Sequence, residues 1–108
     1  MKRGDIVTVA TSGDYGKPRP AVVIQADRLG DTDSVLTCLM TTTRRDTPLY
    51  RLTVSATSET GLRAVSYVMV DKVFAVRRDK CGPVIGRLPA ELLLNLDEML
   101  AVVIGLAD

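Results

Sequence analysis

The sequence contains no histidine and no tryptophan, and it has one phenylalanine and two cysteines among 108 residues. Histidine is the most common general acid or base in enzymes and the most common metal ligand. Its absence excludes a histidine-based catalytic triad and an imidazole acid–base pair, and it disfavours a zinc hydrolase. Any catalysis must therefore use arginine, lysine, tyrosine, a hydroxyl group or a carboxylate.

Other absent features argue against metal binding, secretion and insertion into a membrane. The spacing of Cys38 and Cys81 matches no zinc motif, and no secretory segment precedes them, so we expect reduced thiols in a cytoplasmic protein. The longest apolar run, Met99 to Ile104, is too short to cross a bilayer. We therefore expect no metal, no cofactor and no membrane association. The net charge is only +1, so nucleic-acid binding would require a local basic patch.

The composition favours one small domain with an aliphatic core. A chain of 108 residues forms one domain, residues 1–108, rather than two. Hydrophobic residues make up 46% of it and aromatic residues only 4%. The mean hydropathy of +0.17 is high for a small soluble monomer and indicates that a partner covers some apolar surface.

Short apolar runs rich in β-branched residues predict strands over 5–11, 20–25 and 34–40. Alternation over 49–54 predicts a half-exposed strand, with Leu49, Arg51 and Thr53 on one side. Further strand pieces are expected at 64–70, 73–76 and 84–85, with Asp71 and Lys72 as a break. Strands followed by one helix predict a mainly β (α+β) fold, either a small β-barrel or a strongly curved sheet with a C-terminal α-helix.

The helix is expected over residues 90–104, directly after Pro89. Its second half is apolar on nearly every side, so we expect the sheet to cover one side and a second subunit the other, which predicts a homodimer. One apolar stripe at helical spacing is formed by Leu92, Leu96, Met99, Val103 and Leu106.

Arg19 stands between Pro18 and Pro20, directly before a core strand. The prolines restrict the backbone and hold Arg19 in an extended conformation. If strands 20–25 and 34–40 pair as a hairpin, the loop before the first and the loop after the second meet at one end. These loops carry cations and hydroxyl groups, which are common phosphate partners. Ordinary solvated loops would look the same in sequence, so both interpretations stay open. The loop residues are Asp14, Tyr15, Lys17, Arg19, Thr41, Thr42, Thr43, Arg44 and Arg45.

Five segments in order along the chain resemble the MazF/PemK family of ribonuclease toxins from bacterial toxin–antitoxin pairs. They are residues 2–7 (Lys-Arg-Gly-Asp-Ile-Val), 19–24 (Arg-Pro-Ala-Val-Val-Ile), 40–43 (Met-Thr-Thr-Thr), 70–73 (Val-Asp-Lys-Val) and 85–88 (Ile-Gly-Arg-Leu). The resemblance implies an SH3-like barrel with a C-terminal helix that forms a homodimer. It also implies an endoribonuclease that cuts single-stranded RNA and is silenced by an antitoxin.

The resemblance also implies roles for particular residues. The family's catalytic arginine matches Arg19, and its catalytic threonine at the end of the third strand matches Thr43 best, with Thr42 second because three consecutive threonines blur the alignment. A catalytic aspartate of the PemK branch matches Asp71. That branch has an arginine where this chain has Met69, and a histidine in the first loop, so the version with arginine and threonine suits this sequence better. RNA-binding residues are expected at Lys17, Tyr15, Arg44 and Arg45.

The implied chemistry agrees with the residues present. RNA can be cleaved without a metal when its own 2′-hydroxyl attacks the phosphate, leaving a 2′,3′-cyclic phosphate and a 5′-hydroxyl end. Because an arginine side chain stays positively charged at neutral pH, Arg19 is expected to stabilise phosphate charge rather than act as a base. Thr43 would donate a hydrogen bond to the same phosphate. A cognate antitoxin with an acidic C-terminal segment would compete for these cations.

Two other functions stay open from the sequence. A gyrase poison of the CcdB type shares the fold, but that family ends in Trp-Gly-Ile, whereas this chain ends in Gly-Leu-Ala-Asp and has no tryptophan. A catalytically inactive RNA-binding relative is the second alternative. Single-strand binders usually present aromatic stacking platforms, and few aromatic residues are present here.

Overall fold

The computed structural model describes residues 1–10 and 17–107. Within these residues, six strands and one α-helix follow one another along the chain, with short 3-10 turns at Asp27–Leu29 and Arg78–Lys80. The bounds are β1 (Asp5–Val9), β2 (Arg19–Val23), β3 (Ser34–Thr41), β4 (Arg51–Val54), β5 (Ser66–Arg77), β6 (Cys81–Arg87) and α1 (Ala90–Val103).

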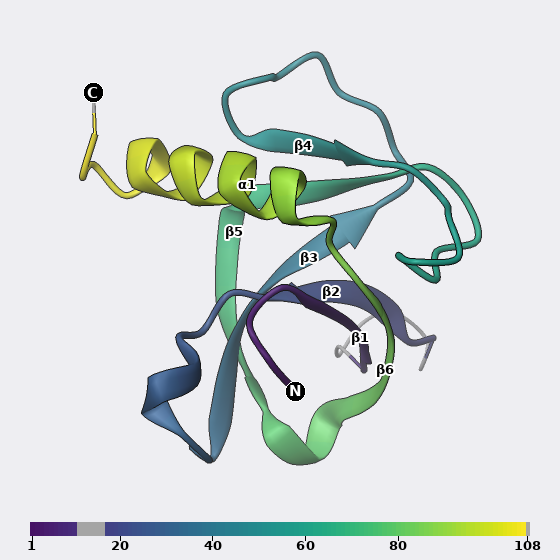
Figure 1. The fold of residues 1–108 in the computed structure, drawn as a ribbon, viewed down its shortest axis with the longest axis vertical. Coiled ribbons are helices and arrows are strands. Elements are labelled where there is room, and N and C mark those ends of the chain that lie inside the picture. Colours follow the sequence, from purple (N-terminus) through teal and green to yellow (C-terminus); the bar gives the residue numbers. More distant parts are fainter. Residues whose placement is uncertain (11–16, 108) are drawn as a thin grey trace.

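The strands form one antiparallel sheet in the order β4-β5-β3-β2-β1-β6, and α1 lies across β4 and β5 (Figure 1). This confirms the prediction of a mainly β fold with a C-terminal helix. Among the described residues no ladder joins the two edge strands, β4 and β6. Instead, residues 55–65, the 55–65 loop, reach β6, where the Arg87 N–H donates to the Glu59 carbonyl at 2.9 Å.

The region predicted as two strands, 64–70 and 73–76, is one continuous strand, β5. Its pairing with β3 shifts register between two positions: Cys38 opposes Val73, whereas Met40 opposes Val68. Asp71 lies in this irregular stretch, where β5 changes direction (Figure 1). The charged pair that suggested a break is exposed on a bent strand, because a bulge lets a strand turn without ending. Strand β6 is also longer than the predicted piece at 84–85.

The core is aliphatic, as predicted, and lies on both faces of the sheet because strand side chains alternate. One cluster lies under α1 and contains Ile6, Val22, Cys38, Met40, Leu52, Val54, Val68, Val70, Leu88 and Leu96. The other lies on the opposite face and contains Val7, Val9, Ala21, Val23, Val35 and Val76.

Most of the predicted helical stripe faces the core: Leu96 is buried, and Leu92, Met99 and Val103 pack against it. The prediction for Leu106 is wrong. The helix ends at Val103 and Gly105 has a φ of 82°, so Leu106 lies beyond the last turn and is 78% exposed. Leu94, Val102 and Ile104 are also exposed.

Threonine side chains organise the 55–65 loop. The Thr60 hydroxyl is buried, donates to the Ser55 carbonyl at 2.8 Å and accepts from the Thr57 N–H at 3.0 Å. The Thr57 hydroxyl in turn accepts from the Thr60 N–H at 3.1 Å. The loop backbone then packs directly on β6: a Cβ added to Gly86 would lie 2.2 Å from the Thr60 carbonyl carbon. The loop therefore stabilises the edge of the sheet.

Candidate functional site

Arg19 is the first residue of β2 and is exposed. The β2–β3 pairing matches Ala21 with Leu39. Extended by two residues along both strands, the same register puts Arg19 at the level of Thr41, the last residue of β3. The loop before β2 and the loop after β3 thus meet at one end of the hairpin.

The threonine run changes character at the end of β3. Thr41 is still in the strand and half-buried, whereas Thr42 and Thr43 follow it and are exposed. The Thr43 N–H donates to the Thr41 hydroxyl at 3.1 Å, which turns the chain out of the sheet. The end of the third strand, the feature used to choose Thr43, is therefore at Thr41. Sequence reasoning did not select Thr41 because nothing within three identical residues marks where a strand stops.

Across the sheet from Thr41, the same row continues on two more strands. Thr41 pairs with Tyr67 on β5, and Tyr67 pairs with Thr53 on β4. Their sequence neighbours Val68 and Leu52 belong to the cluster under α1, so this row lies on the sheet face turned away from the helix. Tyr67 and Thr53 were not among the predicted site residues.

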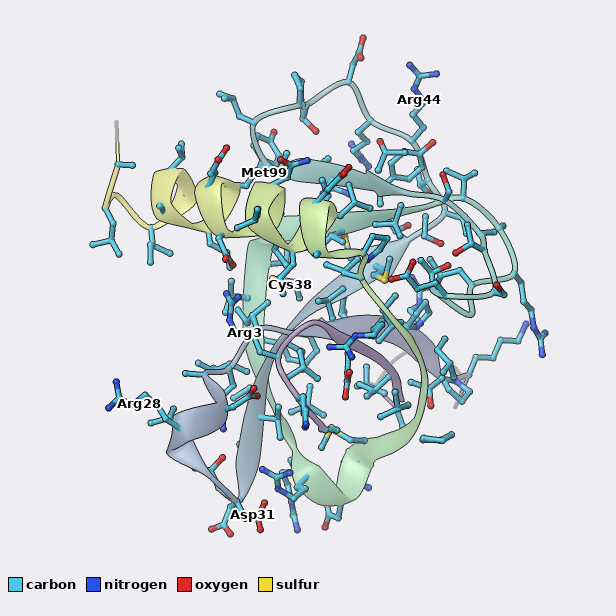
Figure 2. All side chains as sticks on the ribbon, viewed as in Figure 1. Arg3, Arg28, Asp31, Cys38, Arg44 and Met99 are labelled. Atoms are coloured by element: carbon cyan, nitrogen blue, oxygen red, sulfur yellow. The ribbon has the colours of Figure 1, made fainter. Side chains whose placement is uncertain are left out.

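A pocket of about 160 Å³ borders this row. The residues 42–50, the 42–50 loop, form one wall, and β4 and β5 form the other. Both predicted RNA-binding arginines of this loop line the pocket, and Arg44 extends at one end of the molecule, opposite Arg28 and Asp31 (Figure 2). The pocket is lined by Arg44, Arg45, Asp46, Thr47, Pro48, Arg51, Thr53 and Tyr67.

The remaining predicted residues lie elsewhere. Lys17 is exposed two residues before Arg19, and Tyr15 lies outside the described residues. Asp71 is exposed four residues along β5 from Tyr67, within the stretch where the β3–β5 register shifts. The subunit therefore does not bring Asp71 into the row of Thr41 and Tyr67.

The two thiols do not supply a reactive nucleophile. Burial raises the pKa of Cys38 to about 12, with a further rise from Asp71 and an opposing effect of Arg3. Burial also raises the pKa of Cys81. Both groups are therefore protonated near neutral pH. Within residues 1–10 and 17–107, no cluster of three or more cysteine, aspartate or glutamate side chains is arranged to hold a metal, and no helix has the length and apolarity needed to cross a membrane.

Comparison with known proteins places the chain in a family. Residues 2–104 match the model of the PemK-like, MazF-like toxins of type II toxin–antitoxin systems. The chain belongs to this family. It is 44% identical over 108 residues to a probable endoribonuclease MazF of Mycolicibacterium smegmatis, and the match covers 99% of each chain.

Solved structures of MazF-like proteins share the fold. An endoribonuclease in complex with its cognate antitoxin, from a mycobacterial species, matches with a TM-score of 0.81 and 23% identity, over 100% of this chain and 98% of that one. The Mycobacterium tuberculosis toxin MazF-mt6 matches with a TM-score of 0.80 and 24% identity, over 96% and 99%. The resemblance seen in the sequence is thereby confirmed.

Proposed function

We propose that this chain is the toxin of a toxin–antitoxin module and a metal-independent endoribonuclease that cleaves single-stranded RNA. The observation that carries the proposal is its full-length similarity, at 44% identity, to a probable endoribonuclease MazF. The convergence of Arg19 with the threonine run supports it, because this end of the hairpin gathers a guanidinium and hydroxyl groups. We further propose that the curved sheet completes an SH3-like barrel.

Cleavage proceeds by attack of the RNA 2′-hydroxyl on the adjacent phosphate, leaving a 2′,3′-cyclic phosphate and a 5′-hydroxyl. Arg19 stabilises the negative charge that grows on the phosphate oxygens, since a planar guanidinium can donate two parallel hydrogen bonds to them. A threonine hydroxyl donates to the same phosphate. The sequence favours Thr43 and then Thr42, while the register with Arg19 favours Thr41.

The other predicted residues have supporting roles in this proposal. Lys17, Tyr15, Arg44 and Arg45 contact the RNA strand outside the cleaved bond, where arginine and lysine mainly neutralise phosphates. Asp71 acts in catalysis only if the RNA path crosses the bend of β5. The reaction requires no cofactor.

The test is a cleavage assay with purified protein in excess chelator, followed by analysis of the RNA ends. We expect cleavage with cyclic-phosphate ends. Arg19→Ala should lower the rate by roughly 10²–10³. Arg19→Lys should recover little of it, because an ammonium does not replace a planar fork. Cleavage that stops with chelator and returns with magnesium would contradict the mechanism, and a fully active Arg19→Ala protein would contradict the site.

Single valine variants at Thr41, Thr42 and Thr43 identify the catalytic threonine, since valine keeps the shape and removes the hydroxyl. The one whose rate falls by roughly 10²–10³ without a change in unfolding temperature is the phosphate donor. Asp71→Asn serves as the fourth variant. Equal activity of all four would exclude a threonine or Asp71 from the reaction.

We propose two protein partners for this cytoplasmic toxin. The exposed apolar side chains Leu94, Val102 and Ile104 support a homodimer, because a second copy would remove them from water. A cognate antitoxin with an acidic C-terminal segment would bind along Arg19, Arg44 and Arg45, where carboxylates replace phosphates. The related mycobacterial endoribonuclease was solved in complex with its cognate antitoxin, which supports an antitoxin as a partner. Sedimentation checks the dimer, and competition between antitoxin and RNA checks the binding path.

A further inference from the structure

Two residues that line the pocket beside the Thr41–Tyr67–Thr53 row each have a polar side-chain atom without a hydrogen-bond partner among the described residues. These atoms are the Thr47 hydroxyl oxygen and the Arg51 Nε, both shielded from solvent and without a hydrogen bond within the described part of the chain. A buried polar group left without a partner typically costs about 1–3 kcal/mol. Unpaired buried polar groups are uncommon in native folds and need an explanation. One explanation is that they form hydrogen bonds to a ligand when it binds.

The lining of the pocket indicates what kind of ligand it would accept. Three arginines and one aspartate face it, Arg44, Arg45, Arg51 and Asp46, so its formal charge is positive. Arg44 and Arg45 are exposed, whereas Arg51 is half-buried on β4. Both unpartnered groups can donate a hydrogen bond. An anionic group with several acceptor oxygens satisfies all of these features, and phosphate is such a group.

Arg51 and Thr47 are also able to reach a ligand. Among residues 1–10 and 17–107, no hydrogen bond holds the Arg51 Nε or the Thr47 hydroxyl. A small side-chain rotation toward an incoming phosphate would therefore break no hydrogen bond at these atoms, and the new contacts would remove the cost of leaving them unpaired.

The position of the pocket relates it to the proposed reaction. Thr53, which lines it, is two strands from Thr41 along one row, a distance of about 10 Å at normal strand spacing. We propose that this pocket binds a backbone phosphate of the RNA strand flanking the cleaved bond, with Arg51 and Thr47 as its buried donors. The inference rests on the proposed ribonuclease function and adds a phosphate subsite that holds the strand in register.

The test uses an RNA oligonucleotide that contains a cleavage site mapped with wild-type protein. A 2′-deoxy substitution at the cleaved position prevents the reaction, so affinity can be measured. Arg51→Lys keeps the charge but places a methylene where Nε stands. We expect it to weaken binding roughly 10- to 100-fold, the range of one hydrogen bond to a charged group. Thr47→Val should weaken binding in the same direction, and Arg28→Lys, at the opposite end of the molecule, should change nothing.

Neutral methylphosphonate linkages, introduced one at a time, identify the phosphate. Neutralising one particular flanking phosphate should weaken binding to the wild-type protein. The same neutral linkage should cause little further loss of affinity for the Arg51→Lys protein. Neither variant should unfold at a lower temperature than wild type, since neither loses a hydrogen bond at these atoms. Independent, additive losses at every linkage, or wild-type affinity of Arg51→Lys, would overturn the subsite. If removal of a base, rather than neutralisation of a phosphate, eliminates the difference, the pocket reads a base and the phosphate assignment is wrong.

These experiments distinguish failure of the phosphate subsite from failure of the proposed ribonuclease function. A wild-type protein that neither binds nor cuts RNA would refute the ribonuclease proposal and the subsite with it. A protein that cuts RNA normally, but whose Arg51→Lys and Thr47→Val variants bind as wild type, would refute the subsite alone.

Discussion

Two loops flank strand β4, and they differ in whether their buried polar side chains have hydrogen-bond partners. In the 55–65 loop, Thr57 and Thr60 bond each other and the nearby backbone, and the loop lies in direct contact with Gly86 of β6. In the 42–50 loop and the strand that follows it, the Thr47 hydroxyl and the Arg51 Nε have no partner among the described residues. Satisfied polar groups stabilise a fold, whereas unsatisfied ones are available to a ligand. We therefore assign the 55–65 loop a structural role and the 42–50 loop a role in ligand recognition.

The largest effect should come from crowding the scaffold loop. In Gly86→Ala, the new Cβ would lie 2.2 Å from the Thr60 carbonyl carbon and oxygen, which are backbone atoms that cannot rotate away. We expect a loss of about 3 kcal/mol or more in the free energy of unfolding, measured by urea denaturation. Gly30→Ala is the control: its Cβ meets nothing within 4 Å, so despite a φ of 70° it should cost only about 1–2 kcal/mol. Equal losses would show that close packing is not what holds the loop.

A smaller effect should follow from Thr60→Val, which removes the hydroxyl but keeps the shape. The Ser55 carbonyl and the Thr57 N–H then lose a partner. We expect about 1–3 kcal/mol lower stability in the same assay. RNA cleavage per folded molecule should stay at the wild-type level, because the loop does not line the pocket of Arg51. Loss of cleavage at full stability would reverse the roles assigned to the two loops.

The smallest change in stability should come from the same substitution in the other loop. Thr47→Val removes a buried hydroxyl that has no partner within the described part of the chain, so no hydrogen bond seen there is lost. We expect the free energy of unfolding to rise by about 1 kcal/mol, because the cost of a buried, unpaired hydroxyl is removed. Comparing the unfolding free energies of Thr47→Val and Thr60→Val tests the difference between the two loops directly, because the same substitution is made in each. A destabilisation equal to that of Thr60→Val would mean that Thr47 is structural.

The sequence was informative where a residue's own pattern decides its structure. Aliphatic runs predicted the core strands, the period of the last segment predicted α1, and Pro18 and Pro20 drew attention to Arg19. Leu106 was misplaced because helical period alone does not show that Gly105 ends the helix. Likewise, the charged residue Asp71 suggested a break between two strands. The strand instead continues through a bulge, and a bulge depends on the pairing with the partner strand rather than on the strand's own residues.

The site was harder to predict because it is assembled across strands. Nothing along the chain shows that Thr41, Tyr67 and Thr53 share a row, since their alignment depends on the registers of two ladders. One signal was present: the alternation over 49–54 put Arg51 and Thr53 on the side opposite Leu52. An arginine on the exposed side of a strand is common, however, and only the pocket and the missing partner distinguish Arg51.

The contact between Gly86 and the 55–65 loop has a consequence for how such a toxin diversifies. A loop whose backbone touches a neighbouring strand cannot lengthen or change composition without losing that fit. In the 42–50 loop, residues 44–46 follow the candidate catalytic threonines and are exposed, and surface loops tolerate insertion at little thermodynamic cost. Evolution, or a designer retargeting the enzyme to another RNA, therefore has one loop to rewrite and one to leave alone.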